Sequence, residues 1–151
     1  MNELGIVIDL AHLAPEGCWE VLKLTDAPIV LSHCSPRWLF RSDPAGDGSD
    51  GAARRLVEGV AASGGVVGVI AYSQPTLDTM LDDVETLISW AGEDHVGLGT
   101  DFFGIEPAPT GFVGMQDLPN VTRGLVERGL SDDAILKFLG GNYLRVFEQV
   151  W

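Results

Sequence analysis

Basic residues are scarce in this chain of 151 residues. Lysine and arginine together number 9 against 22 aspartates and glutamates, which gives a formal net charge of −13 at pH 7. Proteins that bind nucleic acid need clustered lysine and arginine to neutralise phosphates, and docking on anionic lipid needs a similar basic patch. The composition therefore argues against a nucleic-acid partner and against electrostatic binding to a membrane.

Long apolar runs and cysteines are also lacking. No run approaches the ~20 residues that a membrane-spanning helix requires, and no basic stretch precedes an apolar one at the start, as in a signal peptide. The two cysteines, Cys18 and Cys34, are too few for a disulfide scaffold and are typical of reduced thiols. We therefore predict no membrane segment and a cytoplasmic location. A longer chain ahead of Met1 would reopen the question of location.

Motifs of several common enzyme classes are absent as well. The sequence has no Gly-x-Ser-x-Gly elbow, no Gly-x-x-x-x-Gly-Lys phosphate loop, no Cys-x-x-Cys pair and no His-Glu-x-x-His. These absences argue against a serine hydrolase of the elbow type, a phosphate-loop nucleotidase and a zinc protease of the helical His-Glu type.

Short apolar runs alternate with segments of helical periodicity along the whole chain. The runs are nearly continuous in valine, isoleucine and leucine, which is typical of strands buried on both faces of a parallel sheet. Strands that alternate with helices indicate βαβ units in a single α/β domain over residues 1–151. The expected strands are 5–9, 28–32, 66–70 and 96–100, and the expected helices are 15–24, 52–62, 76–91, 117–128, 131–139 and a last one from 142.

Three of these helices carry more specific expectations. The acids between positions 78 and 85 are predicted to form a solvated helix face. Ser131 is predicted to cap the helix that follows it. Asn142 is expected to cap the last helix, with the side chains of Leu144, Phe147 and Val150 facing inward.

Two of the three histidines and one aspartate stand just past predicted strand ends. His12 follows the first strand, His33 the second and Asp101 the fourth. Because the carboxyl ends of parallel strands lie at one edge of a sheet, these three side chains are expected to converge. Imidazole and carboxylate are the usual ligands of a catalytic Zn²⁺ or a related divalent ion. A metal site is one interpretation, and capping or packing is the other.

Three more residues near the strand ends have separate interpretations. Asp9 is predicted to bind backbone amides or to cap the next turn. Tyr72, after the third strand, either lines the same pocket as the histidines or packs. His95 precedes the fourth strand, at the opposite edge of the sheet, and is predicted to be structural.

Five segments resemble the membrane (renal) dipeptidase family in their order and spacing. That family has a (β/α)8 barrel with a two-metal, usually zinc, site and hydrolyses dipeptides. Because the resemblance covers the second half of that barrel, it implies an α/β fold of four parallel βα units forming the second half of a TIM-type (β/α)8 barrel. The segments are residues 5–12, 28–35, 65–69, 95–102 and 140–147.

The resemblance also implies roles for individual residues. His12 and His33 match the two histidines that hold one of the metals, and Asp101 matches the catalytic aspartate that contacts the water and the substrate amine. Water activated by the metals would attack the peptide carbonyl. Arg41 is the nearest substitute for the family's carboxylate-binding arginine, and Tyr72 is a second candidate for binding the dipeptide substrate.

The chain also departs from the family pattern. The family's His-x-Asp pair and the glutamate that bridges its two metals have no counterpart in these 151 residues, so zinc binding is expected to be weak. Cys34 stands where serine is usual, and it either binds metal or packs. Arg37 matches a family arginine other than the one that binds the substrate.

The leading interpretation is a metal-dependent, dipeptidase-like hydrolase that is incomplete as an isolated chain. One alternative is a non-catalytic half-barrel module or partner subunit, and another is a different metal hydrolase of the amidohydrolase type. Four βα units leave two apolar sheet edges unpaired, which natural proteins usually cover. We therefore expect a homodimer, or a complex with a chain that supplies the first half.

Overall fold

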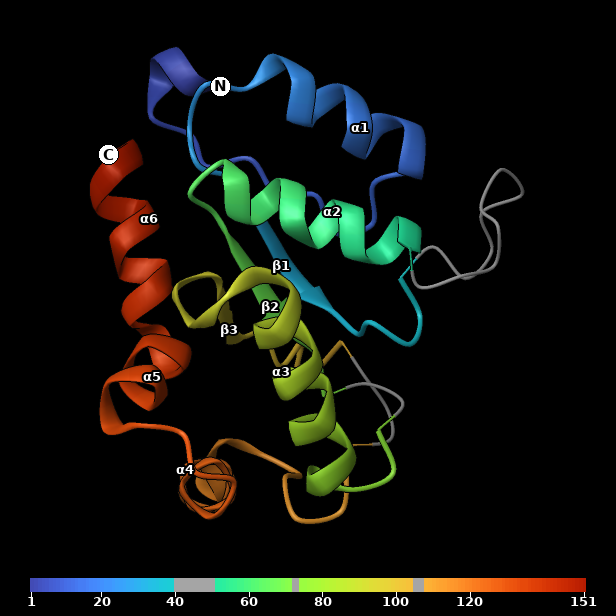
Figure 1. Ribbon diagram of the computed structural model, residues 1–151, viewed down its shortest axis with the longest axis vertical. Coiled ribbons are helices and arrows are strands. Elements are labelled where there is room, and N and C mark those ends of the chain that lie inside the picture. The colour runs from blue at the N-terminus through green and yellow to red at the C-terminus, as the bar shows by residue number, and fades with distance from the viewer. Residues whose placement is uncertain (40–50, 72–73, 105–107) are drawn as a thin grey trace.

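The described part of the computed structural model comprises residues 1–39, 51–71, 74–104 and 108–151. Strands and helices alternate along the chain as predicted (Figure 1). The strands are β1 (Val30–Cys34), β2 (Val66–Val69) and β3 (Val96–Leu98). The α-helices are α1 (Pro15–Leu24), α2 (Gly51–Ala62), α3 (Leu77–Ala91), α4 (Leu118–Glu127), α5 (Asp132–Leu136) and α6 (Asn142–Val150). Shorter helical turns lie at Asn2–Leu4, Glu93–His95, Met115–Asp117 and Lys137–Gly141.

The parallel sheet is smaller than predicted. Its strands follow the order β1–β2–β3, with Val30 opposite Val66 and Val67 opposite Val96. Residues 5–9 do not form a fourth strand, and in the described structure they contribute one isolated parallel bridge, from Asp9 to Val30. The expectation of four paired strands is therefore wrong: the described residues form three strands, and residues 5–9 add only the bridge from Asp9 to Val30.

The start of the chain explains the missing strand. Residues 2–4 form a tight helical turn, Gly5 has a left-handed φ of 64°, and the Ile6 N–H donates back to the Met1 carbonyl at 3.3 Å. Backbone groups that a strand would have offered to β1 are used within this turn. Pairing begins further along, where the Val30 N–H donates to the Ile8 carbonyl and the Leu10 N–H donates to the Val30 carbonyl.

Helices cover both faces of the sheet (Figure 1). On one face, Leu31 and Val67 join the main hydrophobic core with residues of α1, α2 and α3. On the other face, Val146 of α6 packs against Val30 and Val66. Because side chains alternate between the faces of a strand, the near-continuous valine runs contribute side chains to both cores.

Two strand glycines allow α6 to approach its face of the sheet closely. A Cβ on Gly97 would lie 2.6 Å from the ring of Tyr143, and one on Gly68 would lie 2.4 Å from its hydroxyl. The Tyr143 hydroxyl donates to the backbone carbonyl of Ser32 at 3.1 Å. The last helix therefore supports the part of β1 that directly precedes His33.

Helix ends follow the sequence signals in α5 but not in α6. The Ser131 hydroxyl caps α5 by accepting a hydrogen bond from the Ala134 N–H at 3.1 Å, as predicted. Asn142 is not a cap: it lies inside the first turn of α6, 2% exposed, and its amide donates to two backbone carbonyls before and in β3. The inward placement of Leu144 is also wrong, because that side chain is 62% exposed and Val146 is the buried residue.

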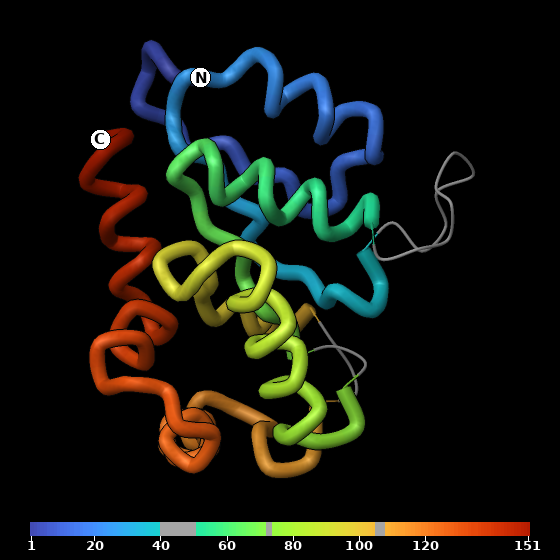
Figure 2. The backbone as a smooth tube through the Cα atoms, viewed as in Figure 1, coloured from blue at the N-terminus to red at the C-terminus, as the bar shows by residue number. Residues whose placement is uncertain are grey.

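The first residues of the chain lie beside the end of α6, as the backbone trace shows (Figure 2). A Cβ on Gly5 would meet the Val150 carbonyl oxygen at 3.1 Å. Across the described ranges, no helix is both long enough and apolar enough to span a bilayer.

Candidate functional site

His12, His33 and Asp101 come together at the carboxyl end of the sheet. The Nε2 atoms of the two histidines are 2.9 Å apart, and their ring centroids are 4.8 Å apart. The His33 Nε2 lies 3.9 Å from Oδ2 of Asp101. The three side chains thus converge as their strand-end positions predicted, although they come from segments far apart in the sequence.

The backbone is strained at two of these three residues. His12 has a φ of 63° and Asp101 a φ of 54°, both in the left-handed region. A residue other than glycine costs about 1–3 kcal/mol in such a conformation, and this strain is concentrated at functional sites. The fold holds both side chains in place in spite of that cost, which favours a functional role over simple capping.

An irregularity in β1 sets the direction of His33. The pairing of β1 with β2 shifts register between Leu31 and Cys34, so the regular ladder is interrupted around Ser32 and His33. Such irregularities re-aim side chains and are frequent next to active sites. The Ser32 hydroxyl lies 3.0 Å from Nδ1 of His33, which leaves Nε2 to face His12.

Asp9 connects the segments that carry the two histidines. Its Oδ1 accepts hydrogen bonds from the Ala11 N–H at 2.9 Å and from the Ser32 N–H at 3.0 Å. The prediction that Asp9 binds backbone amides is confirmed. One carboxylate oxygen therefore holds together the residues that directly precede His12 and His33.

The donor atoms fit part of a metal site. With Zn–N distances of ~2.0–2.1 Å, two imidazoles on a tetrahedral zinc have their nitrogens roughly 3.3 Å apart, close to the 2.9 Å found between His12 and His33. Zinc sites generally use three or four protein ligands. Within the described residues, no group of three or more His, Cys, Asp or Glu is arranged to hold a metal. The pair therefore fits as two ligands of a site that needs more.

Cys34 packs rather than serving as a ligand. Its side chain is buried in the main core, and burial, together with the charge of Asp83, raises the pKa of the thiol well above its ordinary range. Within the described residues, this cysteine belongs to no group of three metal-binding side chains, and it packs as an apolar member of the core. Cys18 is also buried with a free thiol, and burial raises its pKa too.

A buried carboxylate in α3 was missed by the sequence interpretation. Asp83 belongs to the acids expected on a solvated helix face, but it is 1% exposed. Its Oδ1 accepts from Nε of Arg37 at 2.6 Å, and its Oδ2 accepts from Ser35 and Gln74. The signal was present in the spacing, because position 83 falls between the buried Met80 and Leu87 on the inward stripe of the helix.

The remaining candidates divide into one confirmed prediction and two untested ones. His95 is structural, as predicted, with its Nδ1 2.8 Å from the Gly65 carbonyl oxygen at the amino end of β2. Arg41 and Tyr72 lie outside the described residues, so their proposed contacts with substrate stay predictions.

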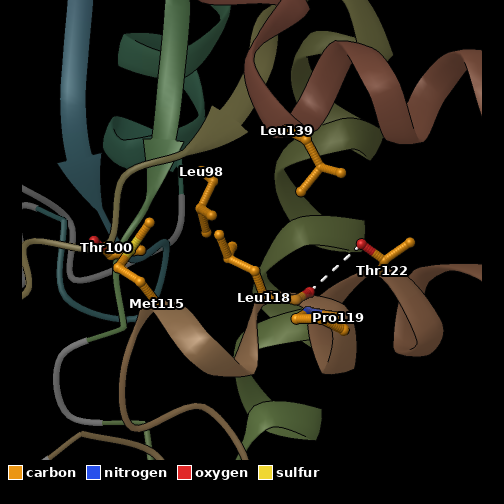
Figure 3. A pocket seen from close by; sticks show the side chains of 7 residues that line it. All are labelled: Leu98, Thr100, Met115, Leu118, Pro119, Thr122 and Leu139. Carbon is orange, nitrogen blue, oxygen red and sulfur yellow. Dashed lines mark hydrogen bonds between the residues drawn. The ribbon is translucent and has the colours of Figure 1, made fainter.

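An apolar pocket of about 610 Å³ lies beside β3, between the strand and α4 (Figure 3). Among the described residues, no titratable side chain lines it, and the Thr122 hydroxyl already donates to the Leu118 carbonyl at 3.4 Å. The pocket therefore offers an apolar surface rather than chemistry. Its lining residues are Leu98, Thr100, Met115, Leu118, Pro119, Thr122 and Leu139.

Sequence comparisons agree with the geometry. The profile of the membrane dipeptidase family (peptidase family M19) matches residues 1–151. Dipeptidase verJ of Clonostachys rogersoniana is 30% identical over 156 residues, which cover 99% of this chain and 39% of that protein. A Schizosaccharomyces pombe protein described as an uncharacterized dipeptidase is 32% identical over 157 residues, which cover 98% of this chain and 37% of that protein. The chain thus spans less than half the length of these relatives.

A solved structure has the same fold over nearly the whole chain. A metallopeptidase from Rhodobacter sphaeroides, liganded with a phosphinate mimic of the dipeptide L-Ala-D-Ala, superposes with a TM-score of 0.85 at 26% identity. The match covers 99% of this chain and 44% of that one, so the three-stranded sheet corresponds to part of a larger structure. With a family profile that matches from the first residue to the last, the chain belongs to the membrane dipeptidase family.

Proposed function

We propose that this chain supplies part of a metal-dependent hydrolase that cleaves dipeptides. The observation that carries the proposal is the facing pair of Nε2 atoms of His12 and His33, 2.9 Å apart, with a carboxylate oxygen of Asp101 3.9 Å from His33. Histidine pairs with a nearby carboxylate are typical of catalytic zinc sites. Family membership and the ligand of the R. sphaeroides structure support a dipeptide as the substrate.

Each residue of the site has a distinct role in this proposal. His12 and His33 would hold one divalent metal, zinc in the first instance, with the Ser32 hydroxyl fixing the orientation of the His33 ring. When bound, such a metal activates water for attack on a peptide carbonyl. Asp101, 33% exposed at its side chain, accepts hydrogen bonds from the water and from the substrate amine. Arg41 and Tyr72 are proposed to bind the remainder of the dipeptide.

The isolated chain should bind metal weakly and hydrolyse little. The described residues hold no set of three metal ligands, and a two-metal mechanism needs both ions. This incomplete set favours the second candidate function: a non-catalytic module or partner subunit with an inherited partial site. A metal hydrolase of another amidohydrolase type would use the same three residues, but it would prefer a substrate other than dipeptides.

Calorimetric titration with Zn²⁺ tests the metal site directly. We expect weak binding to the wild-type chain and none to the His12→Ala variant. The His95→Asn variant is the matched control, because it also loses an imidazole but at the other end of the sheet, and it should bind like the wild type. Equal affinity in the wild type and His12→Ala would refute the proposed ligands.

A dipeptide assay separates the two candidate functions. The chain alone, with added Zn²⁺, is expected to show little or no turnover. Turnover that disappears in Asp101→Asn would instead establish a working enzyme within these residues. Turnover that survives Asp101→Asn would come from a contaminant or from chemistry elsewhere.

Apolar surface at both sheet edges supports the proposal of a partner. Ile6 is 44% exposed at the first edge, and the pocket beside β3 presents Met115 and Leu139 at the other. A second copy, or a chain that supplies the missing half, would cover these edges. Light scattering across a dilution series tests this: a monomer at micromolar concentration with a cooperative melt would contradict it.

A cytoplasmic location stays a prediction.

A further inference from the structure

The chain between β1 and β2 is tied to α3 through a single buried carboxylate. Asp83 accepts hydrogen bonds from the Ser35 hydroxyl at 2.6 Å and from the Gln74 amide at 2.5 Å on Oδ2, and from Arg37 on Oδ1. Ser35 and Gln74 are each 3% exposed. Ser35 follows the end of β1 and Gln74 follows β2, so one side chain connects two loops at the carboxyl end of the sheet.

The turn after β1 has a fixed geometry around this carboxylate. The Ser35 hydroxyl accepts from the Arg37 N–H at 3.2 Å while it donates to Asp83. The Ser35 carbonyl accepts from the N–H groups of Trp38 and Leu39, each at 3.0 Å. Arg37 also donates from Nη2 to the Thr79 carbonyl at 3.4 Å and lies 3.7 Å from Asp82. Asp83 is the buried carboxylate among the α3 groups that hold this turn, and it binds both Ser35 and Arg37.

His33 lies between two such side-chain anchors. The sheet ladder is interrupted between Leu31 and Cys34, so regular strand pairing does not fix the backbone at His33. On the upstream side, Asp9 binds the Ser32 N–H at 3.0 Å. On the downstream side, Asp83 binds Ser35, two residues beyond His33.

We propose that Asp83 is a positioning residue for the His12–His33 pair, which it aligns by anchoring the turn that follows β1. The inference rests on the proposed function, since it concerns how that metal site is built. Residues that orient metal ligands from outside the site typically contribute 10–100-fold to metal affinity. Asp83 orients the histidine pair through Ser35, and it touches neither metal nor substrate.

The test compares Asp83→Asn with a matched control on the same helix. Asp78→Asn removes an exposed carboxylate from α3 and should leave the site unchanged. The first readout is the nuclear Overhauser contact between the imidazole rings of His12 and His33 in the metal-free chain, whose centroids are 4.8 Å apart. The second readout is Zn²⁺ affinity, measured where circular dichroism shows each variant to be folded.

We expect the ring contact to weaken and zinc affinity to fall about tenfold in Asp83→Asn, with no change in Asp78→Asn. If Asp83→Asn does not fold, Ser35→Ala decides, because it removes the hydroxyl that donates to Asp83 and accepts from the Arg37 N–H, while the side-chain bonds of Arg37 and Gln74 to Asp83 stay in place. Folded variants that keep both the ring contact and the wild-type affinity would overturn the inference. If the wild type shows the ring contact but binds no zinc, the proposed function fails, and the ring contact alone then decides the role of Asp83.

Discussion

The two ends of the sheet place similar residues in opposite environments. At the carboxyl end, His33 faces a second imidazole, and two of the three converging residues have left-handed backbones. At the amino end, His95 is 2.8 Å from a carbonyl oxygen, and Asn142 and Arg145 donate to further backbone carbonyls. At the carboxyl end, polar side chains face one another, and two of them stand on strained backbone. At the amino end, polar side chains form hydrogen bonds with the main chain.

This difference indicates a division between function and stability. In α/β barrels, binding and catalysis occur at the carboxyl ends of strands, whereas residues at the amino ends contribute to stability. Variants at the amino end should therefore lower the unfolding free energy without changing the site. Variants of His12 and Asp101 at the carboxyl end, where the backbone is strained, should change metal binding with little loss of stability.

Asn142→Ala should give the largest loss of stability. The amide of Asn142 is buried and donates to the carbonyls of Glu93 and Val96, each at 2.8 Å, so its removal leaves two acceptors unpaired. We expect a decrease of about 2–4 kcal/mol in the unfolding free energy by urea titration. Asn120→Ala is the control: it removes a half-buried amide whose bonds to the Gly111 carbonyl and from Arg123 lie in contact with solvent, so it should cost far less. An equal loss in the two variants would show that the amino end has no special role in stability.

His12→Gly should have the opposite effect: it should abolish zinc binding and leave the stability of the fold intact. Glycine tolerates the φ of 63° without strain, so relief of strain offsets the greater entropy of glycine in the unfolded chain. We expect the unfolding free energy to stay constant or to rise by about 1 kcal/mol, while zinc binding is lost. Asp26→Gly is the control, since Asp26 is exposed and outside the left-handed region, and it should be mildly destabilised. A clear loss of stability in His12→Gly would make its backbone conformation structural rather than functional.

Periodicity and strand-end position predicted much of this molecule. α1 lies at the expected residues, the parallel order of the three strands is correct, and His12, His33 and Asp101 do meet. These features follow from local spacing and from one property of parallel sheets, the common edge of their carboxyl ends. Neither the local spacing nor the common edge of the strands requires knowledge of which side chains are in contact.

Features that depend on specific contacts were not predicted. Residues 5–9 are apolar enough for a strand, but the turn at the chain start uses the N–H groups of Gly5 and Ile6, and pairing with β1 begins only at Ile8. Asp83 lies among exposed acids, and its burial depends on Ser35 and Gln74, which are distant in the sequence. Hydrophobicity averaged along a helix does not reveal such a partner, because a charge is buried only where the fold supplies its hydrogen bonds.

The smallest expected effect concerns an exposed ion pair at the amino end. Lys137 lies 2.8 Å from Asp94, 2.6 Å from Asp133 and 3.5 Å from Glu93, and its hydrogen bond and charge lower the pKa of the Asp94 carboxyl below its ordinary range. A carboxyl with a lowered folded-state pKa stabilises the fold above its unfolded pKa and loses that contribution as the pH falls through the folded pKa. The stability advantage of the wild type over Lys137→Met should therefore be present at neutral pH and should shrink as the pH falls below about 4. Urea titrations of both proteins from pH 7 to pH 2.5 measure the difference, with Lys23→Met on α1 as a control for the general loss of one positive charge. A difference that stays constant across this range would show that the pair contributes to stability through packing of the lysine stem rather than through its charge.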